Sequence, residues 1–292
     1  MTFSAWKEDA ESAAKLNVTL DVFPPDDTGY HLLDSVVAKL SVTDQLCFQI
    51  RSGVKAIRLI VKDKRPNVLS HPPIPRDERN LIVKAVERLL DCVPEFSDVV
   101  WITLHKCIPT ESGLGAGSSN AATTIRVLGN YLGISRDKQQ AIAATIGSDV
   151  SLFMTDGIVR MQNYGDVITP LLLTGALSGV LIRPITGMST PVAYRALDTV
   201  TDRIPGTGTT KLLANMTLTC GSLSNDFQHI VQAINPHVDE VFAYLNGLPD
   251  VHAQLCGSGS TVFACCPDRA TGIRIIKDLA GTVPYLKWVQ TI

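Results

Sequence analysis

The chain has 292 residues, 26 basic and 28 acidic side chains, a formal net charge of −2 and 45% apolar residues. That apolar share can fill large cores and excludes a disordered chain. The balanced charge gives no general electrostatic reason to bind nucleic acid or an anionic membrane, so we expect a small-molecule partner. The length suits about two domains.

The seven cysteines form an odd set without a Cys-x-x-Cys spacing, so we predict neither a disulfide framework nor a zinc site. A reducing, cytoplasmic compartment is the simplest one for such a chain. Residues 1–11 are charged and do not resemble a signal peptide, and the most apolar window, 167–182, is interrupted by Pro170 and two glycines. We interpret this window as two buried strands rather than a membrane span.

The first half of the chain has clear periodicity. Alternating apolar residues predict strands at 14–22, 46–50, 58–61 and 99–104, of which the first has one polar face. A proline-rich stretch from Pro66 to Pro75 predicts a surface loop. Helical spacing and caps predict helices at 81–90, with Asn80 or Asp77 as N-cap, at 120–132 and at 135–146.

The second half begins where the pattern changes to short strands and turns, at about residues 155–165. We place the domain boundary there and predict domains at 1–158 and 159–292. Strands are expected near 167–184, helices near 191–198 and 224–246, and a glycine-rich turn at 257–259 before a strand at 261–265. Because strands and helices come in groups, the pattern favours an α+β fold over a doubly wound parallel sheet.

A glycine-rich segment, Gly113-Leu-Gly-Ala-Gly-Ser-Ser119, joins a predicted strand to a predicted helix. Glycines let the backbone approach a ligand closely, and the N-terminus of the following helix favours an anion, for which phosphate is the expected choice. The segment lacks the lysine of a Walker loop after Gly117. Its G-x-G-x-G spacing also differs from the dinucleotide fingerprint. A tight turn before a capped helix is the alternative interpretation.

Three segments together resemble the motifs of the GHMP kinases, the superfamily of galactokinase, homoserine kinase, mevalonate kinase and phosphomevalonate kinase. Ala14–Asn17 is similar to the first motif, Pro109 with Gly113–Ser119 to the phosphate loop, and Cys256–Phe263 to the third motif. The resemblance implies a two-domain α+β fold, with a ribosomal S5 domain 2-like N-terminal domain that binds ATP and a smaller α+β C-terminal domain that binds the acceptor substrate. It places the active site in the cleft between them.

Within this superfamily the chain resembles the 4-diphosphocytidyl-2-C-methyl-D-erythritol kinases from about residue 12 to about residue 266. The further segments that carry the resemblance are Gly29–His31, Asn80–Ala85, Gly113–Ala122, Gly147–Ser151, Ser189–Tyr194 and Asn225–Phe227. The chain departs from the family at four positions and lacks the basic pattern before Gly29. The four departures are Ala13, Ala116, Ser151 and Cys256.

The resemblance implies an ATP-dependent kinase that phosphorylates the 2-hydroxyl of 4-diphosphocytidyl-2-C-methyl-D-erythritol, in the non-mevalonate route to isoprenoid precursors. Asp149 is expected to accept the hydroxyl proton, a task that a carboxylate performs only at close range and late in the transfer. Lys15 is expected to pair with Asp149, and Asn17 to bind the substrate or Asp149.

The resemblance also implies which residues bind each ligand. Tyr30 and Tyr194 would stack on the cytosine, His31 would bind its edge, and Asp226 would lie near the diphosphate or act as an N-cap. The turn at 257–259 would close the site from the second domain. Mg²⁺ would accompany ATP, with Ser119 as a candidate ligand. The residues expected to bind ATP are Asn80, Lys106, Pro109, Gly113, Leu114, Gly115, Ala116, Gly117, Ser118, Ser119 and Asn120.

Two alternatives remain open at the level of the sequence. Another GHMP kinase, of the homoserine or mevalonate type, would have no need for the aromatic residues Tyr30 and Tyr194 around a cytosine. A non-catalytic nucleotide-binding relative is suggested by Ala116 and Ser151, which replace residues typical of the family.

Overall fold

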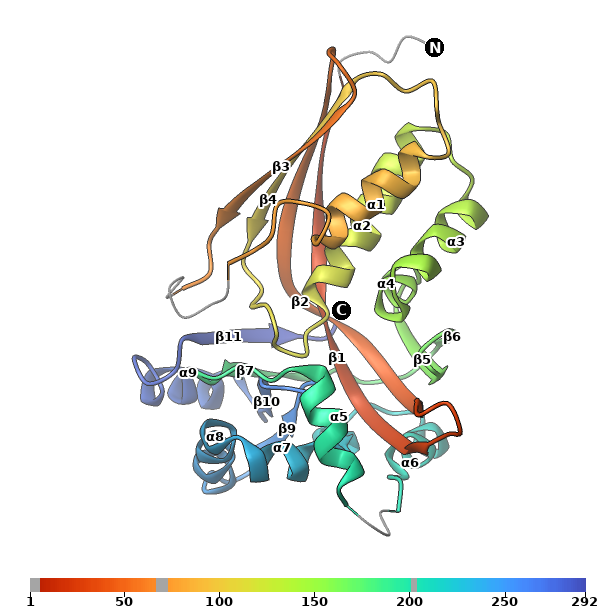
Figure 1. The fold of residues 1–292 in the computed structure, drawn as a ribbon. Helices are drawn as coiled ribbons and strands as arrows, with labels where there is room; N and C mark the ends of the chain where they lie inside the picture. The colour runs from red at the N-terminus through yellow and green to blue at the C-terminus, as the bar shows by residue number, and fades with distance from the viewer. Residues whose placement is uncertain (1–5, 67–72, 201–203) are drawn as a thin grey trace. The chain divides into compact units, whose positions relative to one another are not determined.

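The computed structural model describes residues 6–66, 73–200 and 204–292 (Figure 1). The chain falls into two compact units. Unit 1 contains Met1–Ala14, Thr43–Ile108 and Gly115–Thr155, and unit 2 contains Lys15–Val42, Pro109–Leu114 and Asp156–Ile292. Strands β1 (Trp6–Pro25) and β2 (His31–Arg51) contribute residues to both units. The middle of the predicted proline-rich loop, 67–72, lies outside the described residues.

Unit 1 contains a sheet in which β4 (Val99–Lys106) lies between β2, its antiparallel neighbour, and β3 (Ala56–Asp63), its parallel neighbour. The strand register places apolar residues opposite one another, with Leu46 facing Leu104 and Phe48 facing Ile102. These side chains are buried, so the period-two alternation seen in the sequence forms one apolar face of the sheet.

Four helices lie on one side of this sheet (Figure 1). They are α1 (Leu81–Leu90), α2 (Ala116–Tyr131), α3 (Arg136–Ile146) and α4 (Ser148–Phe153). The predicted bounds of α1 and its Asn80 cap are confirmed, because the Asn80 side chain accepts a hydrogen bond from the Ile82 amide. Helix α2 begins at Ala116, four residues earlier than predicted, because the glycine-rich segment itself forms its first turn.

Unit 2 contains a four-stranded sheet with the order β11-β7-β10-β9. Strands β5 and β6 form an antiparallel pair, β5 also pairs with β2, and β8 pairs in parallel with β1. Strand β6 is largely exposed, so the expectation of two buried strands in the window 167–182 is wrong for β6 and correct for β7. The bounds are β5 Ile158–Asn163, β6 Val167–Leu171, β7 Ser178–Arg183, β8 Ser224–Asn225, β9 His252–Leu255, β10 Val262–Cys265 and β11 Tyr285–Gln290.

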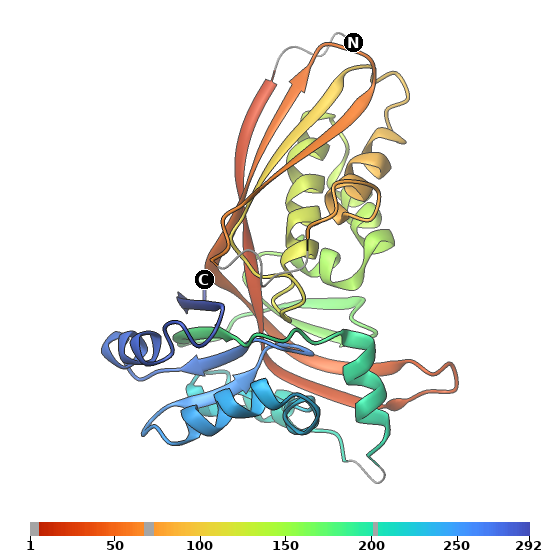
Figure 2. The same ribbon diagram turned by 60° about the vertical axis from the view of Figure 1, so that its left-hand side comes forward.

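The main core of unit 2 lies between one face of the four-stranded sheet and helices α5, α7, α8 and α9 (Figure 2). The predicted helix at 224–246 is two helices, because Pro236 begins α8 and the Asn235 side chain caps it. Helix α6 had no counterpart in the prediction. The bounds are α5 Thr190–Asp198, α6 Gly208–Asn215, α7 Gln228–Ile234, α8 Pro236–Asn246 and α9 Arg269–Asp278.

The polar face of β1 is buried. The side chains at alternate positions, Lys15, Asn17, Thr19 and Asp21, are all shielded from solvent. Burying a charged or polar side chain is costly unless it finds partners. A sequence pattern typical of a strand with one solvated face therefore corresponds here to a buried polar network.

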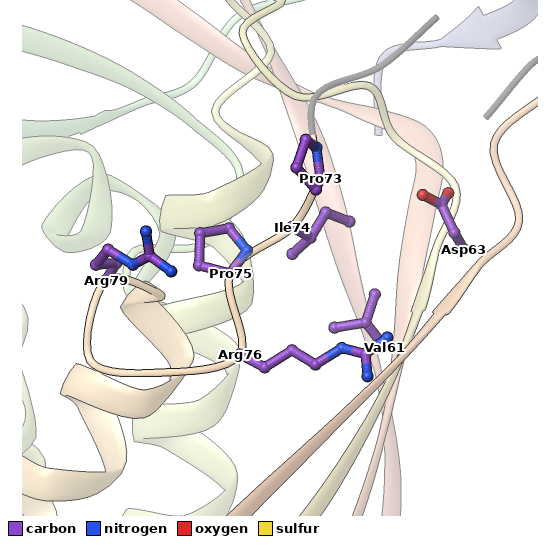
Figure 3. A pocket seen from close by; sticks show the side chains of 7 residues that line it. All are labelled: Val61, Asp63, Pro73, Ile74, Pro75, Arg76 and Arg79. Carbon is purple, nitrogen blue, oxygen red and sulfur yellow. The ribbon is translucent and has the colours of Figure 1, made fainter. Parts of the chain in front are cut away.

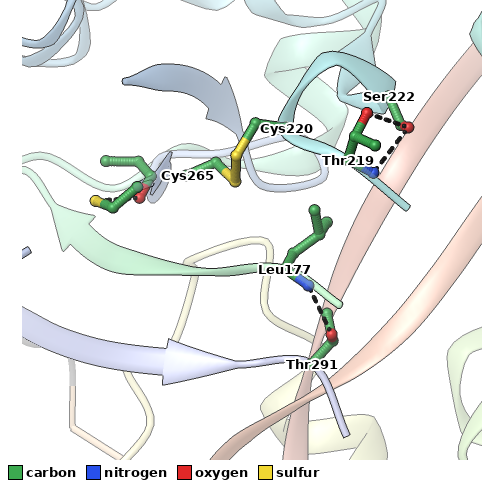
Figure 4. The surroundings of a disulfide bond; sticks show 8 residues. Leu177, Thr219, Cys220, Ser222, Cys265 and Thr291 are labelled. Carbon is green, nitrogen blue, oxygen red and sulfur yellow. Dashed lines mark hydrogen bonds between the residues drawn. A yellow bond between two sulfur atoms is a disulfide. The ribbon is translucent and has the colours of Figure 1, made fainter. Parts of the chain in front are cut away.

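A disulfide joins Cys220, in a short 3₁₀ turn (Cys220–Ser222), to Cys265 on β10 (Figure 4). The expectation of no disulfide is therefore wrong. The two cysteines are 45 residues apart, and such a separation carries no local sequence signature. Among the helices of the described residues, none has the length and apolar character needed to cross a membrane.

Candidate functional site

Lys15 lies on the buried polar face of β1 in unit 2 and is 6% exposed. Its Nζ lies 2.5 Å from Oδ1 of Asn17, whose Nδ2 donates in turn to the Ser35 hydroxyl at 2.9 Å. The Ser35 hydroxyl donates to the carbonyl of Thr19 at 2.6 Å. Two residues that were each predicted to belong to the site, Lys15 and Asn17, thus contact one another, and Asn17 orients the ammonium group of Lys15.

Two glycine-rich turns of unit 2 meet beside Lys15. Gly113 has a φ of +74°, and a Cβ at this position would lie 1.7 Å from the carbonyl oxygen of Cys256, so only glycine fits. The carbonyl of the next residue, Leu114, accepts a hydrogen bond from the Lys15 amide at 3.0 Å. The predicted turn at 257–259 therefore packs on the first part of the phosphate-loop motif.

Cys256 occupies a position where the family usually has threonine, and it is completely buried. Burial raises the pKa of its thiol to about 12. A thiol in this state is a poor nucleophile, so Cys256 is part of the packing and not a reactive group.

Tyr30 lies at the tip of the hairpin between β1 and β2, and it is 69% exposed. Its ring meets the ring of Tyr164 edge to face, with centroids 6.3 Å apart. The Tyr164 hydroxyl donates to the carboxylate of Asp26, which also accepts the amide and hydroxyl of Thr28 at 2.8 and 2.5 Å. These hydrogen bonds, led by that of the Thr28 hydroxyl, lower the pKa of Asp26 to about 2. Asp26 thus organises a hairpin that lacks the family's basic pattern.

His31 links the hairpin to helix α5. Its Nδ1 lies 2.7 Å from the carbonyl oxygen of Phe23, and its Nε2 lies 3.0 Å from Oδ1 of Asp198 at the end of α5. Its ring centroid is 4.9 Å from that of Tyr194, which also contacts Phe227 edge to face. The structure therefore brings His31 and Tyr194 together, and it occupies both ring nitrogens of His31 with protein acceptors.

Asp226 follows strand β8 and binds backbone amides. Its Oδ2 accepts hydrogen bonds from Val22 at 2.9 Å and from Gly206 at 3.0 Å. Nearby, the buried carboxylate of Asp21 accepts the amides of Gly208 and Thr209 at the start of α6. Burial raises the pKa of Asp21 despite these bonds. Sequence reasoning missed Asp21, because an acidic residue on a strand has no distinctive pattern.

Lys106 is buried in unit 1, where its Nζ lies 2.5 Å from Oδ2 of Asp44. Burial lowers the pKa of Lys106, and the nearby Asp44 opposes that shift. The Asn120 amide donates to Asp44 and to the Ser12 hydroxyl, which itself donates to Ser119 at 2.8 Å. Three predicted ATP-binding side chains thus belong to one buried network, centred on an Asp44 that sequence reasoning missed.

A cavity of 640 Å³ opens in unit 1 between the end of β3 and the segment before α1 (Figure 3). Val61, Ile74 and Pro75 give it apolar walls, and Asp63, Arg76 and Arg79 add charged groups of both signs. Asn80 does not line it, but its Nδ2 donates to the carbonyl of Pro75 at 2.7 Å. Asn80 therefore holds Pro75, one of the lining residues, through its Nδ2, while its Oδ1 caps α1.

The remaining predicted residues have ordinary local positions. Gly115 adopts the left-handed conformation with a φ of +66° and precedes Ala116, the first residue of α2. The Ser112 hydroxyl binds the Pro109 carbonyl at 2.8 Å. Asp149 lies in the first turn of α4, which packs against α2. The pairing of Asp149 with Lys15 stays a prediction.

The described residues contain no group of three or more His, Cys, Asp or Glu side chains placed to hold a metal ion. Ser119, the candidate magnesium ligand, is buried, and its hydroxyl accepts a hydrogen bond from Ser12.

Comparison with known families matches residues 80–157 to the GHMP kinases N terminal domain and residues 209–284 to the GHMP kinases C terminal domain. The predicted boundary between residues 158 and 159 falls between these matches and stays a prediction. Among solved structures, a 4-(cytidine 5'-diphospho)-2C-methyl-D-erythritol kinase has a TM-score of 0.79 with 23% identity and covers 98% of this chain and 100% of its own. A mevalonate kinase from L. major has a TM-score of 0.69 with 14% identity, covering 99% and 97%. These likenesses confirm the two-domain α+β fold.

Curated relatives are similar over nearly the whole chain. A 4-diphosphocytidyl-2-C-methyl-D-erythritol kinase from Polaromonas sp. is 32% identical over 282 residues, which is 94% of this chain and 87% of the relative. One from Exiguobacterium sibiricum is 30% identical, covering 93% of each chain. The chain therefore belongs to the 4-diphosphocytidyl-2-C-methyl-D-erythritol kinase family of the GHMP kinases.

Proposed function

We propose that the chain transfers the γ-phosphoryl group of ATP to the 2-hydroxyl of 4-diphosphocytidyl-2-C-methyl-D-erythritol, in the biosynthesis of isoprenoid precursors. The observation that carries this proposal is the similarity to kinases of that name over more than nine-tenths of the chain. The Lys15–Asn17 network and the two glycine turns beside it support it from the structure.

The cytosine stacks on the aromatic side chains of Tyr30 and Tyr194. Stacking on an aromatic side chain contributes roughly 1–3 kcal/mol per base in proteins that bind single strands. His31 has both ring nitrogens engaged, with Phe23 and Asp198. Its side chain can bind the cytosine edge only if one of these contacts opens, so its main contribution is to hold α5 against the hairpin. The proposed diphosphate contact of Asp226 is likewise limited by its bonds to two backbone amides.

The adenine occupies the 640 Å³ cavity of unit 1, whose apolar walls suit a flat base. The amides at the start of α2, from Gly115 to Ser118, bind phosphate oxygens, because the Ser119 amide is the first to donate within the helix. Lys106 acts on the nucleotide indirectly, because its ammonium group is already paired with Asp44. It fixes Asn120, and with it the first turn of the phosphate-binding helix, through their shared carboxylate.

In the transfer step, the carboxylate of Asp149 accepts the proton of the substrate hydroxyl as the new phosphorus–oxygen bond forms. The ammonium group of Lys15 stabilises the negative charge around the reacting oxygens, and Asn17 holds it in place. Mg²⁺ is expected to arrive on ATP, because phosphate oxygens and water supply most of the ligands that this ion prefers.

The test is a coupled assay of ATP turnover with the diphosphocytidyl substrate, with mevalonate and with homoserine. We expect turnover with the first alone. The Asp149→Asn variant should lose about 10²- to 10⁴-fold in kcat, the usual contribution of a general base. Turnover with mevalonate but not with the diphosphocytidyl substrate would refute the function. Full activity of the variant would refute the role of Asp149.

We also propose a cytoplasmic location, where the small-molecule substrates of such a kinase are found. The Cys220–Cys265 disulfide bears on this point, since protein disulfides are rare in a reducing cytosol. Trapping free thiols in freshly lysed cells measures whether this pair is oxidised there, and cell fractionation measures the compartment.

A further inference from the structure

Asn225 is a nearly buried residue at the end of β8, and it is 9% exposed. Its Nδ2 donates two hydrogen bonds, to the carbonyls of Leu255 and Gly257, each at 2.8 Å. Its Oδ1 accepts the amide of Phe227 at 2.9 Å. A side-chain amide has two N–H donors, and here both are used on the same short segment. The carboxamide therefore ties β8 to the glycine-rich turn.

The turn held by Asn225 contacts the beginning of the phosphate loop. The Cys256 carbonyl lies against Gly113, where a Cβ would approach it to 1.7 Å, and a Cβ on Gly257 would lie 3.1 Å from the Gly113 carbonyl. Leu114 then accepts the backbone amide of Lys15 at 3.0 Å. All these residues belong to unit 2. A continuous line of short contacts therefore runs from Asn225 through the turn and the loop to Lys15.

This inference rests on the proposed function. We propose that Asn225 is a positioning residue for phosphoryl transfer, which acts through the turn on the placement of Gly113, Leu114 and Lys15 without touching the substrate. Phosphoryl transfer depends chiefly on in-line placement and charge stabilisation, so small displacements of these groups are costly. The two bonds to the turn are what require an amide at position 225. A carboxylate there would still accept the Phe227 amide but would lose both donors.

A second contact on the same turn provides an internal comparison. The hydroxyl of Ser258 lies 2.9 Å from that of Thr190, and this bond is exposed. Water can replace an exposed hydroxyl contact, whereas a buried carbonyl that loses its donor has no substitute. The placement of the turn therefore depends on Asn225 much more than on Ser258.

The experiment compares Asn225→Asp and Asn225→Ala with the wild type in steady-state kinetics and in amide hydrogen exchange. Both variants should lose about a hundredfold in kcat, the scale of a displacement near 1 Å, while the KM for each substrate changes little. The amides of Cys256, Gly259 and Lys15 donate to the carbonyls of Thr261, Cys256 and Leu114. Their exchange should become about tenfold faster in the variants, because these bonds open more often.

Asn215→Asp is the matched control. Its Nδ2 also donates to a backbone carbonyl, that of Lys211 at 3.0 Å, but on the exposed end of α6 away from the turn. We expect kinetics and exchange like those of the wild type. Thermal unfolding of every variant separates a general loss of stability from misplacement of the turn.

If the Asn225 variants fold poorly, Gly113→Ala tests the same contact from the other side, since its new Cβ displaces the turn while Asn225 stays intact. It should reproduce the fall in kcat and the faster exchange at Lys15. Variants that fold normally and keep kcat within about threefold of the wild type, or that leave exchange at Lys15 unchanged, would overturn the proposal. Hydrogen exchange needs no turnover, so it tests the placement even if the proposed substrate is wrong.

Discussion

Lys15 and Lys106 are both buried lysines, yet they meet different partners. The ammonium group of Lys106 lies 2.5 Å from the carboxylate of Asp44, and that of Lys15 lies 2.5 Å from the amide oxygen of Asn17. A carboxylate both orients an ammonium group and cancels its charge, whereas an amide oxygen orients it without cancelling the charge. Asn17 thus orients the Lys15 ammonium group, whereas Asp44 both orients the Lys106 ammonium group and neutralises its charge inside the fold.

The largest expected effect comes from breaking the Lys106 pair. Asp44→Asn leaves the buried ammonium group without its counter-charge and weakens the acceptor for the amides of Cys107 and Ile108. Removing one partner of a buried pair costs about 3–5 kcal/mol of unfolding free energy. Urea denaturation of the variant and the wild type measures this loss of unfolding free energy. Asp77→Asn is the control, because it breaks the exposed pair with Arg79 and should change stability little.

The second effect concerns Lys15. Lys15→Met keeps a side chain of similar length and removes the charge, so we expect kcat to fall roughly 10²- to 10³-fold, as for the loss of a group that stabilises a transition state. Its unfolding free energy should change much less than that of Asp44→Asn. A large loss of stability with kcat preserved would reverse the roles assigned to the two lysines.

Asn17→Asp sharpens the comparison, because it places a carboxylate at the position next to Lys15 that the Asn17 amide now occupies. The carboxylate would cancel part of the ammonium charge, and kcat should fall about tenfold, which corresponds to about 1.4 kcal/mol of activation free energy. The same change also replaces the donor to Ser35. Ser35→Ala, which removes that bond without adding charge, is therefore the control and should be the milder variant.

The smallest effect is a pH dependence at an exposed carboxylate, Asp26, that lies in neither lysine environment. Hydrogen bonds from the hydroxyls of Thr28 and Tyr164 lower its pKa from the usual 3.8 to about 2 in the folded chain. Because its pKa is depressed, the ionised carboxylate of Asp26 contributes fully to stability above its pKa in the unfolded chain. This contribution is lost as the pH falls towards about 2. Ring resonances of Tyr164 in NMR spectra of the folded chain should therefore stay constant from pH 8 to about pH 3.5 and shift as the pH falls towards about 2. A shift already at neutral pH, or the same acid transition in Asp26→Asn, would contradict this.

The sequence predicted well those features that depend on local patterns. Helix α1 and its Asn80 cap follow from apolar spacing and a capping residue, and the family follows from three short motifs in the right order. The roles of buried polar residues were not predictable in the same way. Asp44 is 62 residues from Lys106, and Asn225 is 32 residues from Gly257, so only the folded chain reveals which carboxylate or amide reaches which partner.

Sequence reasoning also assigned to ligands several residues that the structure places in internal networks. Ser119 and Asn120 bind Ser12 and Asp44 within unit 1, and His31 binds Phe23 and Asp198 within unit 2. A polar residue in a family motif can touch the ligand or can support a residue that does. The motif alone does not distinguish these two roles, because both constrain the residue type in the same way.

The Cys220–Cys265 disulfide changes how the chain responds to a cut in its backbone. It closes a covalent ring that contains β8, α7, α8 and β9, and therefore contains Asn225 and the turn that it holds. A protease that cuts the backbone once between residues 221 and 264 would open this ring without releasing a fragment. On a denaturing gel the nicked protein would run as one species until a reducing agent separates it into two.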